Sequence, residues 1–373
     1  MNQEPKERDE ILDLIRGLSA LIVLAAHIRG FVFQDLGELA APSLLTKIFY
    51  FFTGIHHQAV MVFFVLSGYF VGGGVLNALK KERFSWSHYA LARLSRLWVV
   101  LLPALVLTVL CDQLGSYFAP DAYAGKLRHL WMSGPELNEA GGFSISAFFG
   151  NLVFLQNISF PVFGSNGPLW SLANEFWYYV IFPLLAGGIA SLQKNPLKCG
   201  AWLLLGGLII WWLPLSISSQ GLIWLLGVGV WKIGRKLTGR IREIWAMAGF
   251  FVFLASLAFS KTESLFGSDY AVGIAFSFWM FALLGAWKKL DFLRSLSRYF
   301  SEISYTLYVV HFPVLFLFAA TVLKGKQFSP GAMSYGIFAA LFLGCIGFST
   351  AFYWLFEKRT DRVRQFATKL ISR

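Results

Sequence analysis

Long apolar runs recur along the whole chain and limit what it can fold into. A helix needs about 20 residues to cross a bilayer, and ten runs approach that length. Only 14% of the 373 residues are charged, whereas soluble domains carry about 25% charged residues. The sequence therefore predicts an all-α fold, a polytopic integral membrane protein built as a bundle of about ten transmembrane helices. The expected spans cover residues 11–33, 56–76, 96–115, 168–190, 199–217, 220–234, 244–260, 269–287, 303–323 and 332–356.

The positive charges are concentrated in alternate loops between these runs. The net charge is +12, and with a cytoplasmic N-terminus most lysines and arginines fall on the cytoplasmic side, as the positive-inside rule requires. The apolar segment 147–158 is too short to cross, and counting it as a crossing would destroy this asymmetry. We therefore expect both termini in the cytoplasm and an interfacial or re-entrant segment at 147–158. The same distribution argues against nucleic acid as a partner.

The spans leave no room for an appended soluble domain, so we expect a single transmembrane domain over residues 1–373. The first apolar run follows a charged leader and contains Arg16, which argues against a cleavable signal peptide. The chain has three cysteines and six histidines, and neither set has the spacing of a metal site. The sequence therefore predicts no metal ion, and it leaves the oligomeric state open.

Two ionisable residues, Arg16 and His27, interrupt the first apolar run. Eleven steps of 100° place them on one face of a helix, about 16 Å apart along its axis. Such residues normally face protein or water, because an ionisable residue at mid-membrane costs roughly 2.5–3.5 kcal/mol. One interpretation is a polar seam that faces the bundle. The other is that Arg16 extends to the interface and His27 is a hydrogen-bonded core histidine.

The fourth run opens with several polar and aromatic residues. Glu175 lies about a third of the way into this run, and in the predicted topology both Glu175 and His27 fall in the outer half at similar depth. The two would form either an oriented base or a structural ion pair. Trp170, Ser171 and Asn174 are candidates for binding an acceptor, although aromatic residues near span ends also form interfacial belts.

Two further stretches are candidates for cofactor binding. Ser67 and Gly68, in the second run, allow close approach either of another helix or of a ligand. Arg93 and Arg96 stand three residues apart on one face of a helix that leads into the third run. They would either chelate phosphate or anchor the chain at anionic headgroups. Taken alone, the sequence favours helix packing for the first pair and headgroup anchoring for the second.

The ninth run contains a second polar stripe. Tyr305, Tyr308 and His311 follow one another at intervals of three residues, so they lie on neighbouring positions of one helix face. Polar side chains inside a span normally mark a functional surface. We therefore take these three residues as further candidates for binding the acceptor.

Four of these stretches form an ordered set. Arg16 and His27 have ten residues between them, and residues 63–70 read Phe-Phe-x-x-Ser-Gly-Tyr-Phe. Residues 168–176 read Pro-Leu-Trp-Ser-Leu-x-x-Glu-Phe, and residues 304–313 read Ser-Tyr-x-Leu-Tyr-x-x-His-x-Pro. Together they resemble the acyltransferase 3 family of membrane-bound acyltransferases, over almost the whole chain and including the ten-span count.

The resemblance implies an acyl-CoA donor, usually acetyl-CoA, that is reached from the cytoplasm. The implied acceptor is a hydroxyl of a glycan or lipid-linked glycan. His27 would be the essential histidine and Arg16 its motif partner. Arg93 and Arg96 correspond to the last two arginines of the family's Arg-Arg-x-x-Arg stretch, but its first position is Ala92 here. Other basic residues would then share in binding the CoA phosphates.

We therefore expect a membrane-bound O-acyltransferase at the bacterial inner membrane that moves an acyl group, usually acetyl, to a hydroxyl of a glycan or lipid-linked glycan. Lipopolysaccharide, another polysaccharide, a secreted oligosaccharide and a small-molecule hydroxyl all fit as the acceptor, and the acyl chain length stays open. In this hypothesis His27 is the general base on the acceptor hydroxyl and Glu175 orients it, while Arg16 holds CoA or the electrostatics of the seam. Transient acetylation of His27 is a variant of the hypothesis. The competing interpretations are a transporter or flippase of a glycan or lipid, which makes no bond, and an inactive scaffold.

Overall fold

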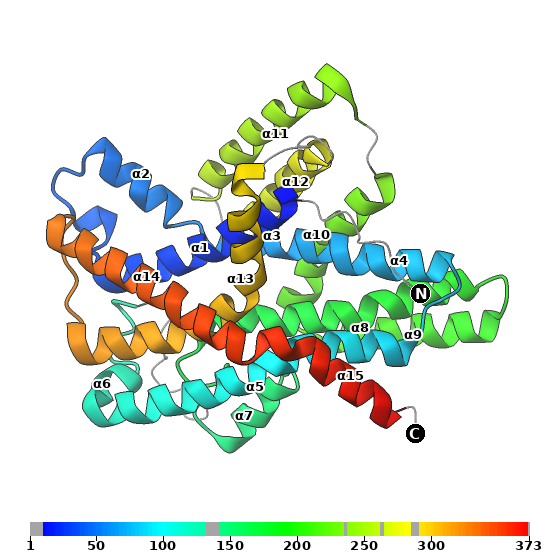
Figure 1. The fold of residues 1–373 in the computed structure, drawn as a ribbon, viewed down its shortest axis with the longest axis horizontal. Coiled ribbons are helices and arrows are strands. Elements are labelled where there is room, and N and C mark those ends of the chain that lie inside the picture. Colours follow the sequence, from blue (N-terminus) through cyan, green and yellow to red (C-terminus); the bar gives the residue numbers. More distant parts are fainter. Residues whose placement is uncertain (1–9, 132–141, 235–236, 262–264, 285–290, 372–373) are drawn as a thin grey trace. The chain divides into compact units, whose positions relative to one another are not determined.

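A computed structural model describes residues 10–131, 142–234, 237–261, 265–284 and 291–371 (Figure 1). Within these ranges most residues are helical, and the only extended pairings are two isolated bridges. The prediction of an all-α membrane protein is therefore confirmed. The helices are α1 (Glu10–Val32), α2 (Leu44–Phe52), α3 (His56–Ser67), α4 (Gly73–Lys80), α5 (Trp86–Phe118), α6 (Pro120–Tyr123), α7 (Ile145–Leu152), α8 (Trp170–Ser191), α9 (Pro196–Trp212), α10 (Leu215–Ile233), α11 (Gly239–Phe259), α12 (Leu265–Leu283), α13 (Asp291–Phe318), α14 (Ala332–Leu355) and α15 (Thr360–Ile371).

Two π-helical segments continue helices of this set. The segment η2 (Gly68–Gly72) joins α3 to α4, and η4 (Ala319–Leu323) extends α13. Short 3-10 turns occur at Leu36–Glu38, Gly167–Leu169 and Glu357–Arg359.

Six helical stretches of the described residues are long and apolar enough to cross a membrane, so the predicted count of about ten spans is not confirmed. The helices α8 and α10 are long enough, but polar residues such as Glu175 and Gln220 make them less apolar. The helix α9 is apolar but shorter. The six stretches are Glu10–Val32, His56–Lys80, Trp86–Phe118, Gly239–Phe259, Leu293–Leu323 and Ala332–Leu370.

One predicted span ends earlier than expected, and the reason is physical. The predicted span 199–217 ends earlier, at Trp212, because Pro214 disfavours helical backbone at the residue before it. Leu213 accordingly has φ −70° and ψ 145°. The segment 147–158 contains most of the short helix α7, whose eight residues span about 12 Å. Such a helix cannot cross a bilayer, which agrees with the interfacial or re-entrant segment predicted there.

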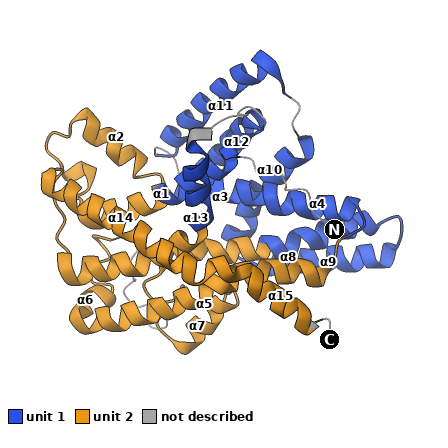
Figure 2. Ribbon diagram, in the orientation of Figure 1, with its two compact units in different colours: residues 1–21, 57–83, 178–304 blue, residues 22–56, 84–177, 305–373 orange. Residues whose placement is uncertain are grey.

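The chain divides into two compact units, each assembled from three segments (Figure 2). Unit 1 comprises residues 1–21, 57–83 and 178–304. Unit 2 comprises residues 22–56, 84–177 and 305–373. Because each unit draws on separated parts of the chain, neither corresponds to one continuous stretch of sequence.

In unit 1 the segment η2 packs closely against α10. A Cβ atom added at Gly68 would lie 1.8 Å from the carbonyl oxygen of Trp224. A Cβ added at Gly227 would lie 1.9 Å from the carbonyl oxygen of Val65. Only glycine permits backbones to approach so closely, as is common where helices pack in membranes.

Unit 2 contains a cluster of aromatic side chains contributed by α1, α13 and the segment that follows α5. Phe31 contacts Trp131, Phe312 and Phe316 with ring centroids 5.4 to 6.0 Å apart. Tyr123 meets Phe316 edge-on at 4.8 Å. Such tilted and edge-on contacts are the preferred geometries of aromatic pairs. The cluster therefore packs the C-terminal ends of α1 and α13 against the segment that follows α5.

Candidate active site

The centre of the candidate site is a pair of histidines in unit 2. His27 lies in α1 and His311 in α13, and the Nδ1 atom of His27 is 2.8 Å from the Nε2 atom of His311. The two rings are stacked at 22°, with centroids 5.1 Å apart. His311 is buried, with 1% of its surface exposed, whereas His27 is half-buried. The structure therefore brings together two residues that the sequence analysis placed in separate roles.

The hydrogen bonds of this histidine pair indicate which ring nitrogens carry protons. The Nδ1 atom of His311 is 2.7 Å from the carbonyl oxygen of Leu307, and a carbonyl oxygen can only accept, so Nδ1 of His311 carries a proton. In the neutral ring Nε2 is then an acceptor. The Nδ1–H of His27 donates to it, which leaves a lone pair on Nε2 of His27. Within the described residues, no hydrogen bond occupies that nitrogen.

Aromatic rings surround His27 on its other sides. The ring of Phe312 meets it edge-on at 5.0 Å, and the ring of His56, at the start of α3, lies 5.3 Å away at 52°. His56 was a weak lead in the sequence because it has no metal spacing. Its position shows that three of the six histidines of the chain gather in one place.

A second hydrogen-bonded chain starts one helical turn before His311. The hydroxyl of Tyr308 is 2.7 Å from Oγ of Ser171 and 2.9 Å from the carbonyl oxygen of Pro168. Since the carbonyl can only accept, Tyr308 donates to it and Ser171 donates to Tyr308. Glu175, one turn further along α8, interacts electrostatically with Tyr308. The start of α8 is thereby fixed to α13.

Buried polar residues anchor the loop before α8, and the sequence analysis missed them. Asp112 of α5 is 3% exposed and accepts two hydrogen bonds from Ser165, one from Oγ at 2.6 Å and one from the backbone N–H at 2.7 Å. The amide of Asn166 donates to Oγ1 of Thr108 and to the carbonyl oxygen of Val309. The available signal was a carboxylate within the third apolar run.

The remaining candidate residues of the fourth and ninth apolar runs lie in α8 and α13. Asn174 is 2% exposed in α8, and Trp170 begins that helix. The hydroxyl of Tyr305 donates to the carbonyl oxygen of Leu97 in α5 at 3.1 Å. Tyr305 therefore ties α13 to α5, whereas Tyr308 ties it to the start of α8. Glu175 was expected beside His27, and the structure places His311 at the Nδ1 atom of that ring, so the role of Glu175 stays a prediction.

Arg16 lies in the same continuous helix as His27, as predicted, and its described contacts are in unit 1. Its guanidinium is 4.9 Å from the ring centroid of Phe70 and 3.9 Å from a carboxylate oxygen of Asp13. Asp13 also accepts a hydrogen bond from Ser301 at 2.7 Å. Phe70 belongs to η2, so the arginine contacts the second of the four family-like stretches.

Ser67 and Gly68 make the contacts of helix packing in unit 1. The indole N–H of Trp224 donates to Oγ of Ser67 at 3.1 Å, and the hydroxyl of Tyr179 lies at the same distance from it. Gly68 is the site of close approach between η2 and α10. These contacts favour the packing interpretation over ligand binding for both residues.

Arg93 and Arg96 lie in the first turns of α5, which belongs to unit 2. Arg96 is exposed and Arg93 is half-buried, and Arg93 interacts electrostatically with Tyr89. Their spacing of three residues puts both on neighbouring positions of one face. Phosphate binding by the pair stays a prediction.

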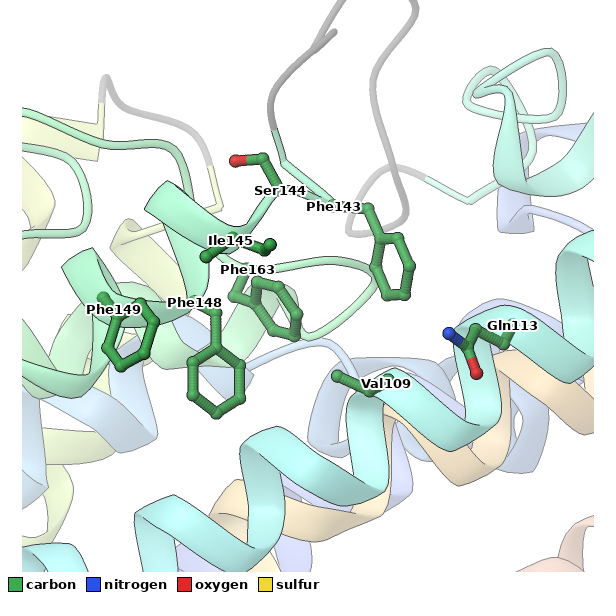
Figure 3. Close-up of a pocket in the computed structure, with 8 residues that line it drawn as sticks. All are labelled: Val109, Gln113, Phe143, Ser144, Ile145, Phe148, Phe149 and Phe163. Atoms are coloured by element: carbon green, nitrogen blue, oxygen red, sulfur yellow. The ribbon is translucent and has the colours of Figure 1, made fainter.

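A separate apolar pocket of about 400 Å³ lies between α5 and α7 (Figure 3). Phenylalanine rings dominate its lining, and its polar lining side chains are Gln113 and Ser144. None of the predicted catalytic or binding residues lines it.

Among the described residues, no group of three or more His, Cys, Asp or Glu side chains is arranged to hold a metal ion. A family model described as an acyltransferase domain matches residues 9–354. No curated protein and no solved structure matches the chain.

Proposed function

Because the chain belongs to the acyltransferase 3 family, we propose that this membrane acyltransferase uses acyl-CoA, with acetyl-CoA as its donor, and acylates a hydroxyl group. The proposed acceptor is a glycan or lipid-linked glycan, such as lipopolysaccharide or another polysaccharide. The proposed location is the bacterial inner membrane, with both termini in the cytoplasm. In this arrangement the donor reaches the protein from the cytoplasmic side.

The observation that carries the proposal is the unoccupied lone pair on Nε2 of His27. A general base needs a lone pair that can come within hydrogen-bond distance of the proton it takes. The Nδ1–H of His27 is held by His311 at 2.8 Å, so Nε2 is the nitrogen available to an acceptor. His27 is half-buried rather than sealed in the core. These properties are those of an oriented base rather than of a structural core histidine.

The reaction proceeds as follows in the proposal. The acceptor oxygen attacks the carbonyl carbon of the thioester while its proton passes to Nε2 of His27. The new C–O bond forms, and the C–S bond breaks with the electron pair on sulfur. The imidazolium of His27 then returns the proton to the thiolate, which leaves as free CoA. Transient acylation of Nε2 is a variant that uses the same nitrogen.

The other candidate residues have supporting roles in the proposal. Arg93 and Arg96 bind the CoA phosphates through charge-assisted hydrogen bonds. Arg16, held over Phe70, stabilises negative charge on the donor. Glu175 orients His27 or tunes the charge of the site, in which it interacts electrostatically with Tyr308.

Acyl transfer by purified His27→Ala protein tests the proposal. The assay uses radiolabelled acetyl-CoA, cell-envelope glycan and protein in lipid nanodiscs, and CoA binding is measured in parallel. We expect transfer to fall by about 100- to 10,000-fold, the range that general base catalysis contributes, while CoA binding persists. Gly229→Ala is the control, since nothing lies within 4 Å of a Cβ at that position.

Two results would contradict the proposal. Transfer by His27→Ala at the rate of the Gly229→Ala control would remove His27 from the mechanism. Passage of unmodified glycan across a vesicle membrane, with all label remaining on the donor, would identify a transporter or flippase instead.

A further inference from the structure

We infer that His311 is a positioning residue that sets the tautomer of His27, so that Nε2 of His27 takes the proton of the acceptor. The inference rests on the proposed function, because it assigns a role within that reaction. It replaces the acceptor-binding role that the sequence suggested for His311.

The tautomer of His311 is fixed by its own helix. Its Nδ1 atom faces the carbonyl oxygen of Leu307, one turn earlier in α13, at 2.7 Å. This carbonyl belongs to the backbone and accepts only, so the contact requires Nδ1–H on His311. With 1% of His311 exposed, water has little access with which to stabilise the other tautomer.

The tautomer of His311 in turn determines which nitrogen of His27 carries the proton. A separation of 2.8 Å between two ring nitrogens requires one proton between them. If His27 carried its proton on Nε2, its Nδ1 lone pair would face the lone pair of His311. That arrangement would leave two buried acceptors opposed, which is costly in a poorly solvated interior. The neutral pair therefore holds His27 in the Nδ1–H form.

During the proposed reaction His311 keeps both of its hydrogen bonds. Both nitrogens of His311 are engaged, Nδ1 by Leu307 and Nε2 by His27, so His311 has no nitrogen for the acceptor. When His27 gains a proton on Nε2, its Nδ1–H still donates to His311, and no group has to rotate. Preorganisation of this kind lowers the barrier without adding a contact to the substrate. His311 thus acts through His27 and does not touch the reacting atoms.

Two amide substitutions separate this role from a packing role. In His311→Gln the amide oxygen lies where Nε2 was and can accept from His27. In His311→Asn the amide nitrogen lies where Nδ1 was and can donate to Leu307, but no group reaches His27. We expect His311→Gln to keep kcat within about tenfold of wild type and His311→Asn to lose about 100-fold. The KM for acetyl-CoA should be similar in both.

A spectroscopic measurement decides the matter without relying on activity. Protein labelled with ¹⁵N-histidine, with His27 assigned by comparison with His27→Gln, reports which nitrogen carries the proton. We expect a protonated Nδ1 and an unprotonated Nε2 on His27 in the wild type, and loss of this preference in His311→Asn. This measurement also applies if both amide variants are inactive.

Equal kcat for His311→Gln and His311→Asn, with an unchanged His27 tautomer in both, would overturn the inference. A proton on Nε2 of wild-type His27 would overturn it as well. Failure of the proposed function looks different, because His27→Ala would then transfer acyl groups at the wild-type rate. An inactive His27→Ala together with a fully active His311→Asn would refute the inference alone.

Discussion

The carboxylate of Asp112 should contribute a large share of the stability of unit 2. It is 3% exposed and accepts both the hydroxyl and the backbone N–H of Ser165 at 2.6 and 2.7 Å. Ser165 is itself 1% exposed. Replacing Asp112 by alanine would therefore leave two buried donors without an acceptor. These donors belong to the loop that places Pro168 and Ser171 against α13.

The expected cost follows from these contacts. A buried donor left unsatisfied costs about 1–3 kcal/mol, so the two donors together set a cost of about 3 kcal/mol for Asp112→Ala. At about 2 °C per kcal/mol, the lower end for larger domains, the midpoint of thermal inactivation should fall by about 6 °C. Ser165→Ala removes only the hydroxyl bond and should cost about half as much.

Thermal inactivation of the protein in detergent, followed by CoA binding or activity, measures these shifts. Asp121→Asn is the matched control, because the carboxylate of Asp121 is 72% exposed and pairs with Lys126 at the surface. Exposed ion pairs contribute about 0–1 kcal/mol, so this variant should behave as wild type. If Asp112→Ala were as stable as Asp121→Asn, the reasoning about Ser165 would be refuted.

Two further substitutions test the packing and the second hydrogen-bonded chain. Gly227→Ala should prevent stable insertion or folding, because its Cβ would lie 1.9 Å from a backbone oxygen. Gly229→Ala, in the same helix, is the control, because its Cβ would meet nothing within 4 Å. Comparable yields and elution profiles of the two purified variants would contradict this expectation. Tyr308→Phe removes the donor to Pro168 and the acceptor of Ser171, and should lower stability by about 1–2 kcal/mol. A double-mutant cycle with Ser171→Ala checks it, and strictly additive effects would show that the 2.7 Å contact carries no energy.

The helical segments of this chain could be predicted because their cause is local. A run of about 20 apolar residues specifies a membrane helix without reference to the rest of the protein, and α1 and α14 fall within one residue of the predicted spans. The number of crossings was harder to predict. Polar residues such as Glu175 make α8 less apolar, although the helix is long enough to cross a membrane. The sequence does not show whether neighbouring helices provide partners that offset the cost of placing these polar residues in the membrane.

The individual residues of the candidate site could be predicted from the sequence, but the contact between His27 and His311 could not. The intervals of three residues in α13 placed Tyr308 and His311 on one face. Glu175 was suggested as the partner of His27 because the two residues have matching predicted depths in the membrane. The sequence did not show which helices are neighbours. The hydrogen bond between His27 and His311 joins residues 284 positions apart, and no local pattern encodes such a distance.

The sequence by itself determined that the chain is an all-α membrane protein, and its ordered motifs indicated the acyltransferase family. The role of His27 in the reaction stays a prediction. Only the tertiary structure decided which side chain meets the Nδ1 atom of His27. Periodicity fixes the face of a helix on which a side chain lies, but it does not fix the rotation of that helix against another. The contact between His27 and His311 depends on that rotation, because the two residues lie on different helices, α1 and α13.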